Sequence, residues 1–219
     1  FPPDLDYVVA LATPLSVSEG IKEIKHTLVE ALVLVIIVVF IFLQGWRATL
    51  IPLLAVPVSL VGTFMLFPLF GFSINTLSLF GLVLAIGIVV DDAIVVVENV
   101  ERNMALGMSP REASYKTMDE VGTALVAIAL VLTAVFAPSA FITGISGQFY
   151  RQFAVTIAIS TVISAFNSLS LSPAMAAILL RPHDAPKDWL TRGMDRVFGG
   201  FFRWFNRFFN RNAGRYSSL

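Results

Sequence analysis

The stretch Gly87-Ile88-Val89-Val90-Asp91-Asp92-Ala93-Ile94-Val95-Val96-Val97 places two adjacent carboxylates inside an otherwise apolar run. The run extends from Ile74 to Val100, which is longer than the roughly 20 residues that a helix needs to cross the hydrocarbon core of a bilayer. Backbone groups in lipid must find their hydrogen bonds within their own segment, so a run of this length and apolarity is a helix. The sequence therefore predicts a membrane-spanning helix with Asp91 and Asp92 near its centre.

The composition of the whole chain supports a membrane protein. Of its 219 residues, 57% are hydrophobic and 14% are charged, and the mean hydropathy is +0.82. About a quarter of the residues of a typical soluble domain are charged. The apolar residues also come in long blocks, which is typical of transmembrane segments.

Four more apolar runs accompany the aspartate run: Leu28–Leu43, Ala48–Phe70, Val121–Ile142 and Phe149–Leu180. The first is short, but it can extend back through Glu30 and His26. Residues 44–47, 71–73 and 144–148 form the expected short breaks, and residues 99–120 a longer charged connection with a helix start at 109–112. We expect an all-α membrane protein with five transmembrane helices over residues 27–180, preceded by a periplasmic lead-in over residues 1–26.

The basic residues predict the orientation. In a five-span topology, twelve of the 15 basic residues lie on the same side of the membrane. They are Arg47, three residues of the 99–120 connection and eight residues from Arg181 to Arg215. Positive residues concentrate on the cytoplasmic side of short loops. We therefore expect a periplasmic N-terminus and a cytoplasmic C-terminus.

Residues 181–219 have a different pattern, that of a cytoplasmic amphipathic helix. Arginines recur at intervals of four or seven, and phenylalanines fall on the opposite face. The residues expected to define the two faces are Arg203, Arg207 and Arg211, and Phe201, Phe205 and Phe208. A basic face backed by aromatic residues is typical of a helix that lies in the plane of the membrane. An ordinary soluble amphipathic helix is the alternative.

The adjacent aspartates are the candidate functional site. A carboxylate at mid-membrane costs roughly 3 kcal/mol even on the lenient insertion scales, and intramembrane acids usually mark ion or proton pathways. Burial and mutual repulsion favour the protonated pair, whereas a cation from another helix would favour ionisation. We expect both side chains to be buried and to act as a coupled proton relay. A purely structural pair, held by hydroxyls or by a cation, is the alternative.

Other residues of the apolar runs are expected to support this site. Gly81 and Ala85 give the aspartate helix a small face for close packing, and Gly87 lies one turn before Asp91. Asn167, Ser168, Ser170 and Ser172 form a polar stripe in the last run. The stripe fits either hydrogen bonds between helices or a path for protons or water.

The sequence offers little for metal or cofactor chemistry. Cysteine is absent, which excludes a disulfide framework and a thiolate metal site. His26 and His183 lie outside the apolar runs and far apart. We expect no metal and no cofactor, with protons as the coupling ion, and no nucleic-acid partner.

The aspartate helix, together with Gly71–Ser78 before it and Glu98–Arg102 after it, resembles the resistance–nodulation–division (RND) efflux pumps. The likeness is greatest to their hydrophobe/amphiphile branch, the bacterial multidrug exporters. Residues 47–58 and 171–174 are similar to the same family. The resemblance implies a trimeric inner-membrane pump that contributes to antibiotic resistance and whose paired aspartates, here Asp91 and Asp92, relay the protons that drive drug export.

The resemblance also implies a larger assembly. Family members have twelve spans in two similar halves, with a large periplasmic porter domain after the first span of each half. The five runs resemble spans two to six, and the tail resembles the cytoplasmic helix between the halves. The chain starts at Phe1 rather than at a methionine, and we expect it to be a piece of such a pump. The first span, the porter domains and the second half with its relay lysine would then be partners, beside a periplasmic adaptor, an outer-membrane channel and membrane lipid.

Three other functions compete with proton-coupled transport by an RND pump. An intramembrane aspartyl protease needs two aspartates that face each other from different helices, but Asp91 and Asp92 are about 100° apart on one helix. Another polytopic ion-coupled transporter remains an alternative. A channel is not favoured, because no run resembles a filter loop or a ring of charges.

Overall fold

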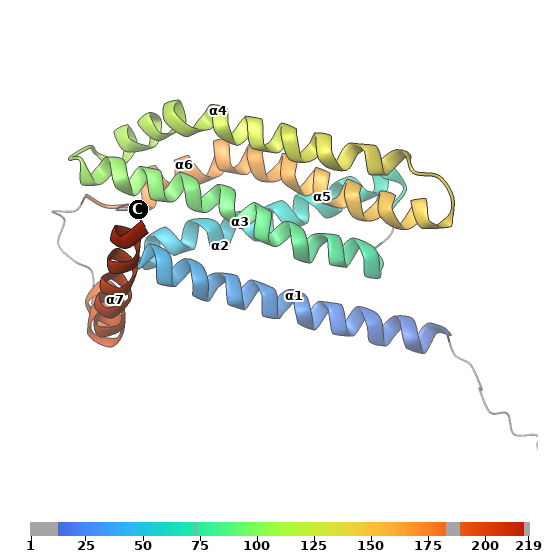
Figure 1. Ribbon diagram of the computed structural model, residues 1–219, viewed down its shortest axis with the longest axis horizontal. Helices are drawn as coiled ribbons and strands as arrows, with labels where there is room; N and C mark the ends of the chain where they lie inside the picture. The colour runs from blue at the N-terminus through green and yellow to red at the C-terminus, as the bar shows by residue number, and fades with distance from the viewer. Residues whose placement is uncertain (1–12, 73, 183–188, 217–219) are drawn as a thin grey trace, which may run out of the picture.

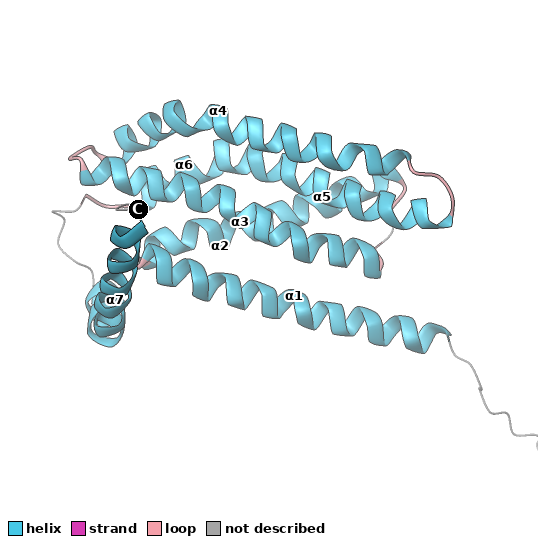
Figure 2. Ribbon diagram, viewed as in Figure 1, coloured by secondary structure: helices cyan, strands magenta, loops and turns pink. Residues whose placement is uncertain are grey.

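The computed structural model describes residues 13–72, 74–182 and 189–216 of the chain. These residues form α1 (Thr13–Leu43), α2 (Trp46–Leu66), α3 (Thr76–Ala105), α4 (Pro110–Phe136), α5 (Ile145–Leu169), α6 (Leu171–Leu179) and α7 (Trp189–Tyr216). Short 3₁₀ helices, η1 (Phe67–Phe70) and η2 (Ala137–Phe141), follow α2 and α4. The described residues contain no strand (Figure 2), and the predicted all-α class is confirmed.

Five segments of the described chain are long and apolar enough to cross a membrane: Ser18–Leu43, Trp46–Phe70, Thr76–Ala105, Pro110–Phe141 and Gly147–Leu179. They run alternately in opposite directions, so that the connections after α1 and α3 and the end of α6 lie at one end of the bundle (Figure 1). The expected five transmembrane helices are therefore present. Arg47 ties this end together, because its Nη1 donates a hydrogen bond of 2.9 Å to the carbonyl of Leu179.

Helices α3 and α5 form the centre of the bundle. They make the most extensive contact of any two described elements. In α3, and also in the α5–α6 segment, 56% of the most apolar stretch of the span is buried. The corresponding share is only 6% in α1 and α4, which lie on the outside of the bundle (Figure 1). The aspartates therefore lie on one of the two helices that the rest of the chain surrounds.

The long charged connection expected over residues 99–120 is wrong, because both helices continue into it. Only residues 106–109 lie between α3 and α4. Arg102 forms an ion pair of 2.6 Å with Glu120, and Asn103 donates a hydrogen bond of 3.0 Å to Thr117. Ser109 begins α4 with a capping box, as its sequence indicates. The charges thus join two helix ends that extend beyond the apolar segments.

The last apolar run is also divided differently from the prediction. It breaks at Ser170 (φ −120°, ψ −64°) into α5 and α6. Pro173 explains the break, because its ring would clash with the carbonyl of Leu169 in a continuous helix and it has no N–H to donate. The break expected before this run, over residues 144–148, is also shorter than predicted. Gly144 has a φ of 90°, and α5 begins directly after it at Ile145.

The other expected breaks also differ from the prediction: the break after residue 70 lasts until α3 begins at Thr76, whereas the first break is shorter than expected. Only Gln44 and Gly45 separate α1 from α2, so that Trp46 and Arg47 are helical. Helix α1 starts at Thr13, within the expected lead-in, and its first described residues are a charged extension of the span. Residues 1–12 of that lead-in lie outside the described residues.

Candidate functional site

Helix α3 carries the aspartates at its middle, and a cap fixes its N-terminal end. The Asn75 side chain accepts hydrogen bonds from the backbone N–H groups of Leu77 and Ser78, both at 3.0 Å. The Ser78 hydroxyl in turn accepts a hydrogen bond of 2.9 Å from the Asn75 N–H, which completes a capping box. Asp91 and Asp92 follow about four turns later.

Asp92 faces the interior of the bundle. Its side chain is buried, with 7% exposed, and Ser164 Oγ of α5 donates a hydrogen bond of 2.7 Å to its Oδ2. Ser164 Oγ also lies 3.4 Å from the carbonyl oxygen of Val89. A serine hydroxyl can donate one hydrogen bond and accept two. Ser164 can therefore donate to an ionised Asp92, or accept from a protonated Asp92 while donating to Val89, so that the contact serves both protonation states.

Asp91 faces the other way, and the expectation that both aspartates are buried is wrong for it within this chain. Asp91 is exposed, because adjacent residues of a helix point about 100° apart. It belongs to the open face of α3, which we define as Phe80, Leu84, Gly87, Asp91 and Val95. A carboxylate at this depth is too costly to face lipid. In a membrane the open face must therefore meet further protein or water.

The small residues expected to pack beside the site differ in their surroundings. Gly81 lies tightly against α5: a Cβ added to it would be 3.2 Å from the Cβ of Thr156 and 3.3 Å from the Phe153 carbonyl oxygen. Ala85 is buried, with 1% exposed. Gly87, in contrast, is on the open face. A Cβ added to it would have no described atom of another helix within 4 Å. A packing role for Gly87 is therefore not met within the described chain.

Ser164 is the functional candidate that the sequence prediction missed. It stands alone among apolar neighbours, and the predicted polar stripe began only at Asn167. The available signal was the interval of four residues that links Ser160, Ser164 and Ser168 along one helix face. Asn167 itself donates a hydrogen bond of 2.8 Å to Ser59 Oγ of α2.

The described residues contain no group of three or more His, Cys, Asp or Glu side chains that could hold a metal ion. Asp92 has a hydroxyl rather than a second carboxylate as its partner across the helices. This geometry does not support the aspartyl protease alternative, which needs two opposed carboxylates. What the pair can do chemically is take up and release protons.

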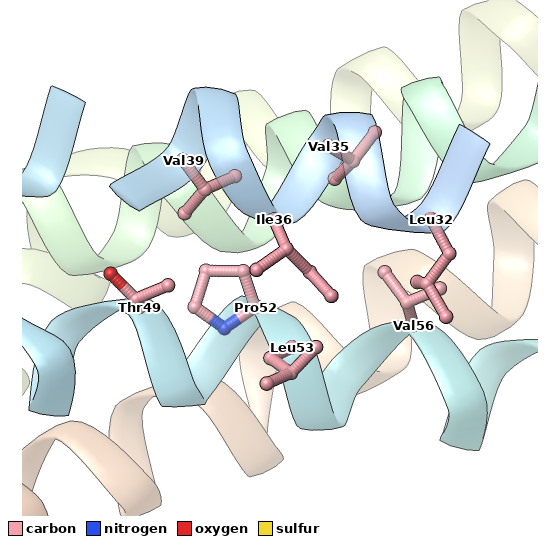
Figure 3. Close-up of a pocket in the computed structure, with 8 residues that line it drawn as sticks. All are labelled: Leu32, Val35, Ile36, Val39, Thr49, Pro52, Leu53 and Val56. Atoms are coloured by element: carbon pink, nitrogen blue, oxygen red, sulfur yellow. The ribbon is translucent and has the colours of Figure 1, made fainter. Parts of the chain in front are cut away.

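The cavity between α1 and α2 is not a competing site. It is lined by Leu32, Val35, Ile36, Val39, Thr49, Pro52, Leu53 and Val56, and these side chains point toward one another from the two helices (Figure 3). Its volume of about 10 Å³ would hold no more than one water molecule. Its lining is almost wholly apolar, so it is a packing defect of the helix pair.

Helix α7 packs against the C-terminal end of α1 and runs across the direction of the bundle (Figure 1). The ring centroids of Phe40 and Phe202 are 5.7 Å apart, and those of Phe42 and Phe205 are also 5.7 Å apart. Phe202 is buried, whereas Phe201 is 43% exposed. Arg203 and Arg207 are exposed; the side chains of Phe208 and Arg211 lie outside the described residues. Part of the aromatic face that was expected to enter the membrane thus contacts protein.

This contact gives a prediction for α7 in a full-length protein that carries this chain. A short bifunctional thiol crosslinker should join cysteines that replace Phe42 and Phe205, because the contact of the two rings places the two helices side by side. Adding Phe202→Ser should reduce the yield several-fold, since it removes a buried ring from the contact with Phe40. Adding Phe201→Ser, a matched change of an exposed ring, should leave the yield unchanged. Equal yields in all three proteins would contradict this docking of α7.

Comparison with known proteins gives matches over the whole chain. Residues 1–219 match the AcrB/AcrD/AcrF family. The toluene efflux pump membrane transporter TtgB of Pseudomonas putida is 48% identical over 218 residues, which are 99% of this chain and 20% of that protein. The multidrug export protein AcrF of Escherichia coli is 47% identical over 219 residues, or 100% of this chain and 20% of that protein. The multidrug resistance protein MdtF of Escherichia coli is 50% identical over 182 residues, or 83% of this chain and 18% of that protein.

Proposed function

Because the chain belongs to the AcrB/AcrD/AcrF family, we propose that it forms part of the transmembrane proton-translocating domain of a proton/drug antiporter. The resemblance to RND multidrug efflux pumps, first drawn from the aspartate helix, is confirmed by this membership. The family is one of transporters rather than enzymes. The chain spans about one fifth of the length of the curated relatives that it matches, so the activity of a whole pump is part of the proposal.

The observation that carries the proposal is the different placement of the two aspartates at the middle of α3. Asp92 is buried against the Ser164 hydroxyl, whereas Asp91 is on the open face. One carboxylate therefore has a partner inside this chain, and the other is available to a partner outside it. A lysine of the second half of the pump, placed against the open face, would stabilise the ionised pair and leave when a proton binds.

The proton cycle then follows from the two states of the pair. In the proposed cycle a proton is released when the cation approaches the carboxylates and is taken up when the cation leaves, because a nearby positive charge stabilises a carboxylate in its charged form. Each proton that crosses gains about 2.3 kcal/mol per 100 mV of membrane potential. This free energy can be transferred to drug export if the lysine moves with the rest of the second half.

The remaining parts of the assembly come from the family resemblance. We propose a homotrimer in the bacterial inner membrane, completed by the first span, the porter domains and the second half, and joined to a periplasmic adaptor and an outer-membrane channel. The exported compounds would be antibiotics or other drugs. The names of TtgB as a toluene efflux pump and of AcrF as a multidrug export protein support this proposal.

The orientation is testable with single cysteines in the full-length pump. The proposal places the N-terminus in the periplasm, so a cysteine at Gly71 or Ile145 should react with a membrane-impermeant maleimide in intact cells. A cysteine at Leu106, which is 73% exposed, should react only after the membrane is opened. Labelling of all three positions from the same side would contradict the five-span topology.

The proposal itself is tested by drug export from proteoliposomes that contain the full-length pump and are given an imposed pH gradient. Export should depend on both carboxylates, and binding of the drug to the periplasmic part should not. Wild-type export from Asp91→Asn and from Asp92→Asn would mean that the pair is structural.

A further inference from the structure

Helices α4 and α6 pack against each other at the end of the bundle where Arg47 bonds to Leu179 (Figure 1), and a groove opens between them. The volume of this α4–α6 groove is about 480 Å³. Sites that hold small molecules have volumes of about 300–1,000 Å³. The residues that shape the groove are Arg111, Tyr115 and Met118 of α4 and Ala174, Ala177 and Ile178 of α6.

The groove follows from the spacing of side chains on the two helices. Ala174 and Ala177 are three residues apart, so their small side chains lie on one face of α6 and leave space beside it. Arg111, Tyr115 and Met118 have the intervals of four and three residues that place them on one face of α4. The groove is therefore a hollow between two regular helices, with a cation at one end and apolar side chains along the rest.

Arg111 is the charged end of the groove. Its Cζ lies 5.9 Å from the ring centroid of Tyr115, and its side chain is exposed. A contact over the face of a ring does not use the N–H donors of a guanidinium, of which there are five. In the part of the chain that the structure describes, no carboxylate forms an ion pair with Arg111. The groove thus presents a positive charge and hydrogen-bond donors to a ligand.

The other charged residues on these turns of α4 are outside the lining. The carboxylate of Glu112 accepts hydrogen bonds from the N–H of Ser109, at 3.1 Å, and from its hydroxyl, at 2.8 Å. Lys116 pairs with Glu120, which also pairs with Arg102 of α3. These charges are neutralised at the helix cap and on the α3 side. They do not compensate the positive charge in the groove.

The groove lies at the depth where lipid headgroups meet acyl chains. The fourth and fifth membrane-spanning segments both end here, at Pro110 and Leu179. Tyrosine is enriched at such interfaces, and arginine on the cytoplasmic side of them. From Arg111 to Met118 the wall of the groove is about 10 Å long, whereas the hydrocarbon of one leaflet is about 15 Å thick. The wall is therefore long enough to hold the upper part of one acyl chain.

We propose that the α4–α6 groove binds an anionic phospholipid of the cytoplasmic leaflet, with the phosphate against Arg111 and an acyl chain between Met118 and Ala174. An unpaired positive charge favours a headgroup with a net negative charge, because the ammonium of a zwitterionic headgroup would find no carboxylate in the lining. Another helix of the pump would bury the guanidinium unless it supplied a carboxylate. The inference rests on the proposed function only for the leaflet, because it takes this end of the bundle as cytoplasmic.

The test places a fluorescent reporter at the rim of the groove. Ile178, which is 78% exposed, is replaced by cysteine in a full-length pump without other cysteines and is labelled with bimane. The pump is reconstituted in phosphatidylcholine vesicles that contain either brominated phosphatidylglycerol or brominated phosphatidylcholine. Bromine on an acyl chain quenches the reporter on contact. We expect phosphatidylglycerol to bind about fivefold better than phosphatidylcholine, which corresponds to the contribution of about 1 kcal/mol from one arginine at an anionic surface.

Arg111→Gln should abolish this preference, and Lys116→Gln is its matched control. Both changes remove one positive charge from an exposed side chain of α4, but Lys116 pairs with Glu120 and does not line the groove. Lys116→Gln should therefore keep the fivefold preference. Ala174→Phe should reduce quenching by both lipids, because the ring fills the apolar part of the groove. Ala127→Phe, the same change at an exposed position of α4 outside the groove, should not.

The outcomes separate the lipid site from the proposed function. Equal quenching by the two lipids in the protein with Arg111 would overturn the inference, and quenching by neither would show that another part of the pump covers the groove. An equal loss of preference in Lys116→Gln would also overturn it, because general surface charge would then explain the effect. These measurements need no proton flux. Wild-type export from Asp91→Asn and Asp92→Asn would overturn the proposed function, while the fivefold preference would still support the lipid site.

Discussion

Drug export by the full-length pump will fall to background when either Asp91 or Asp92 is replaced by asparagine. Asparagine has nearly the shape of aspartate but cannot take up or release a proton. The loss of one carboxylate separates export from the proton gradient, whose driving force is about 2.3 kcal/mol per proton for each 100 mV. Export from proteoliposomes under an imposed pH gradient measures this effect, and drug binding to the same variants should remain close to that of the wild type.

The matched control for this prediction is Asp119→Asn on α4. Asp119 is an exposed carboxylate outside the α3–α5 contact, and its replacement should leave export intact. Asn at position 92 can still accept the hydrogen bond of Ser164, and position 91 is exposed, so both variants should insert and fold normally. Export at the wild-type rate in both would show that the carboxylates do not carry protons.

Replacement of Gly81 by leucine will have the largest effect on the fold. Even a Cβ at this position would lie 3.2 Å from two carbon atoms of Thr156 and 3.3 Å from the Phe153 carbonyl oxygen. Thr156 is β-branched and stiff, and the carbonyl belongs to the backbone, so neither can give way easily. Overpacking of this kind costs about 1–3 kcal/mol. We expect a lower unfolding temperature and reduced export, because α3 and α5 must separate at Thr156, and a shift of α5 there would also disturb the contact of Ser164 with Asp92 further along the same pair of helices.

The comparison of Gly81→Ala with Gly122→Ala isolates the contact from helix propensity. Alanine gains about 1 kcal/mol over glycine in a helix interior, and both glycines are helical. An added Cβ at Gly122 would meet only Leu169 Cδ2, at an ordinary 3.7 Å. Gly122→Ala should therefore stabilise the protein in a thermal unfolding assay and Gly81→Ala should destabilise it. Stabilisation by both would mean that α3 and α5 do not lie as close as described.

The apolar runs predicted the five spans, because run length and the need for internal backbone hydrogen bonds leave helices as the solution. The same reasoning fails at residues 99–120, where the charges predict a connection but α3 and α4 continue. Arg102 and Glu120 are on different helices, and their ion pair is a tertiary contact that no local pattern shows. The apolar run Phe149–Leu180 also does not predict the break at Ser170, although Pro173 in the sequence is a residue that can interrupt a helix.

The candidate site could be found from the sequence only in part. Two aspartates in an apolar run predict a proton site, and helical geometry predicts that they point in different directions. Which of them is buried depends on where α5 packs, and that is set by the contacts of Gly81 with Thr156 and of Asp92 with Ser164 across the α3–α5 contact. The partner of Asp92 is therefore set by tertiary structure, as is the open face on which Asp91 lies.

The most direct test of the central claim is infrared spectroscopy of the full-length pump during a pH change. A carboxylic acid that loses its proton loses its C=O stretching band and gains carboxylate bands. We expect a difference band from buried carboxyl groups in the wild type that disappears in Asp92→Asn and changes in Asp91→Asn, while Asp119→Asn retains the wild-type band. The same band in the wild type and in both site variants would contradict the claim that this pair takes up and releases the proton.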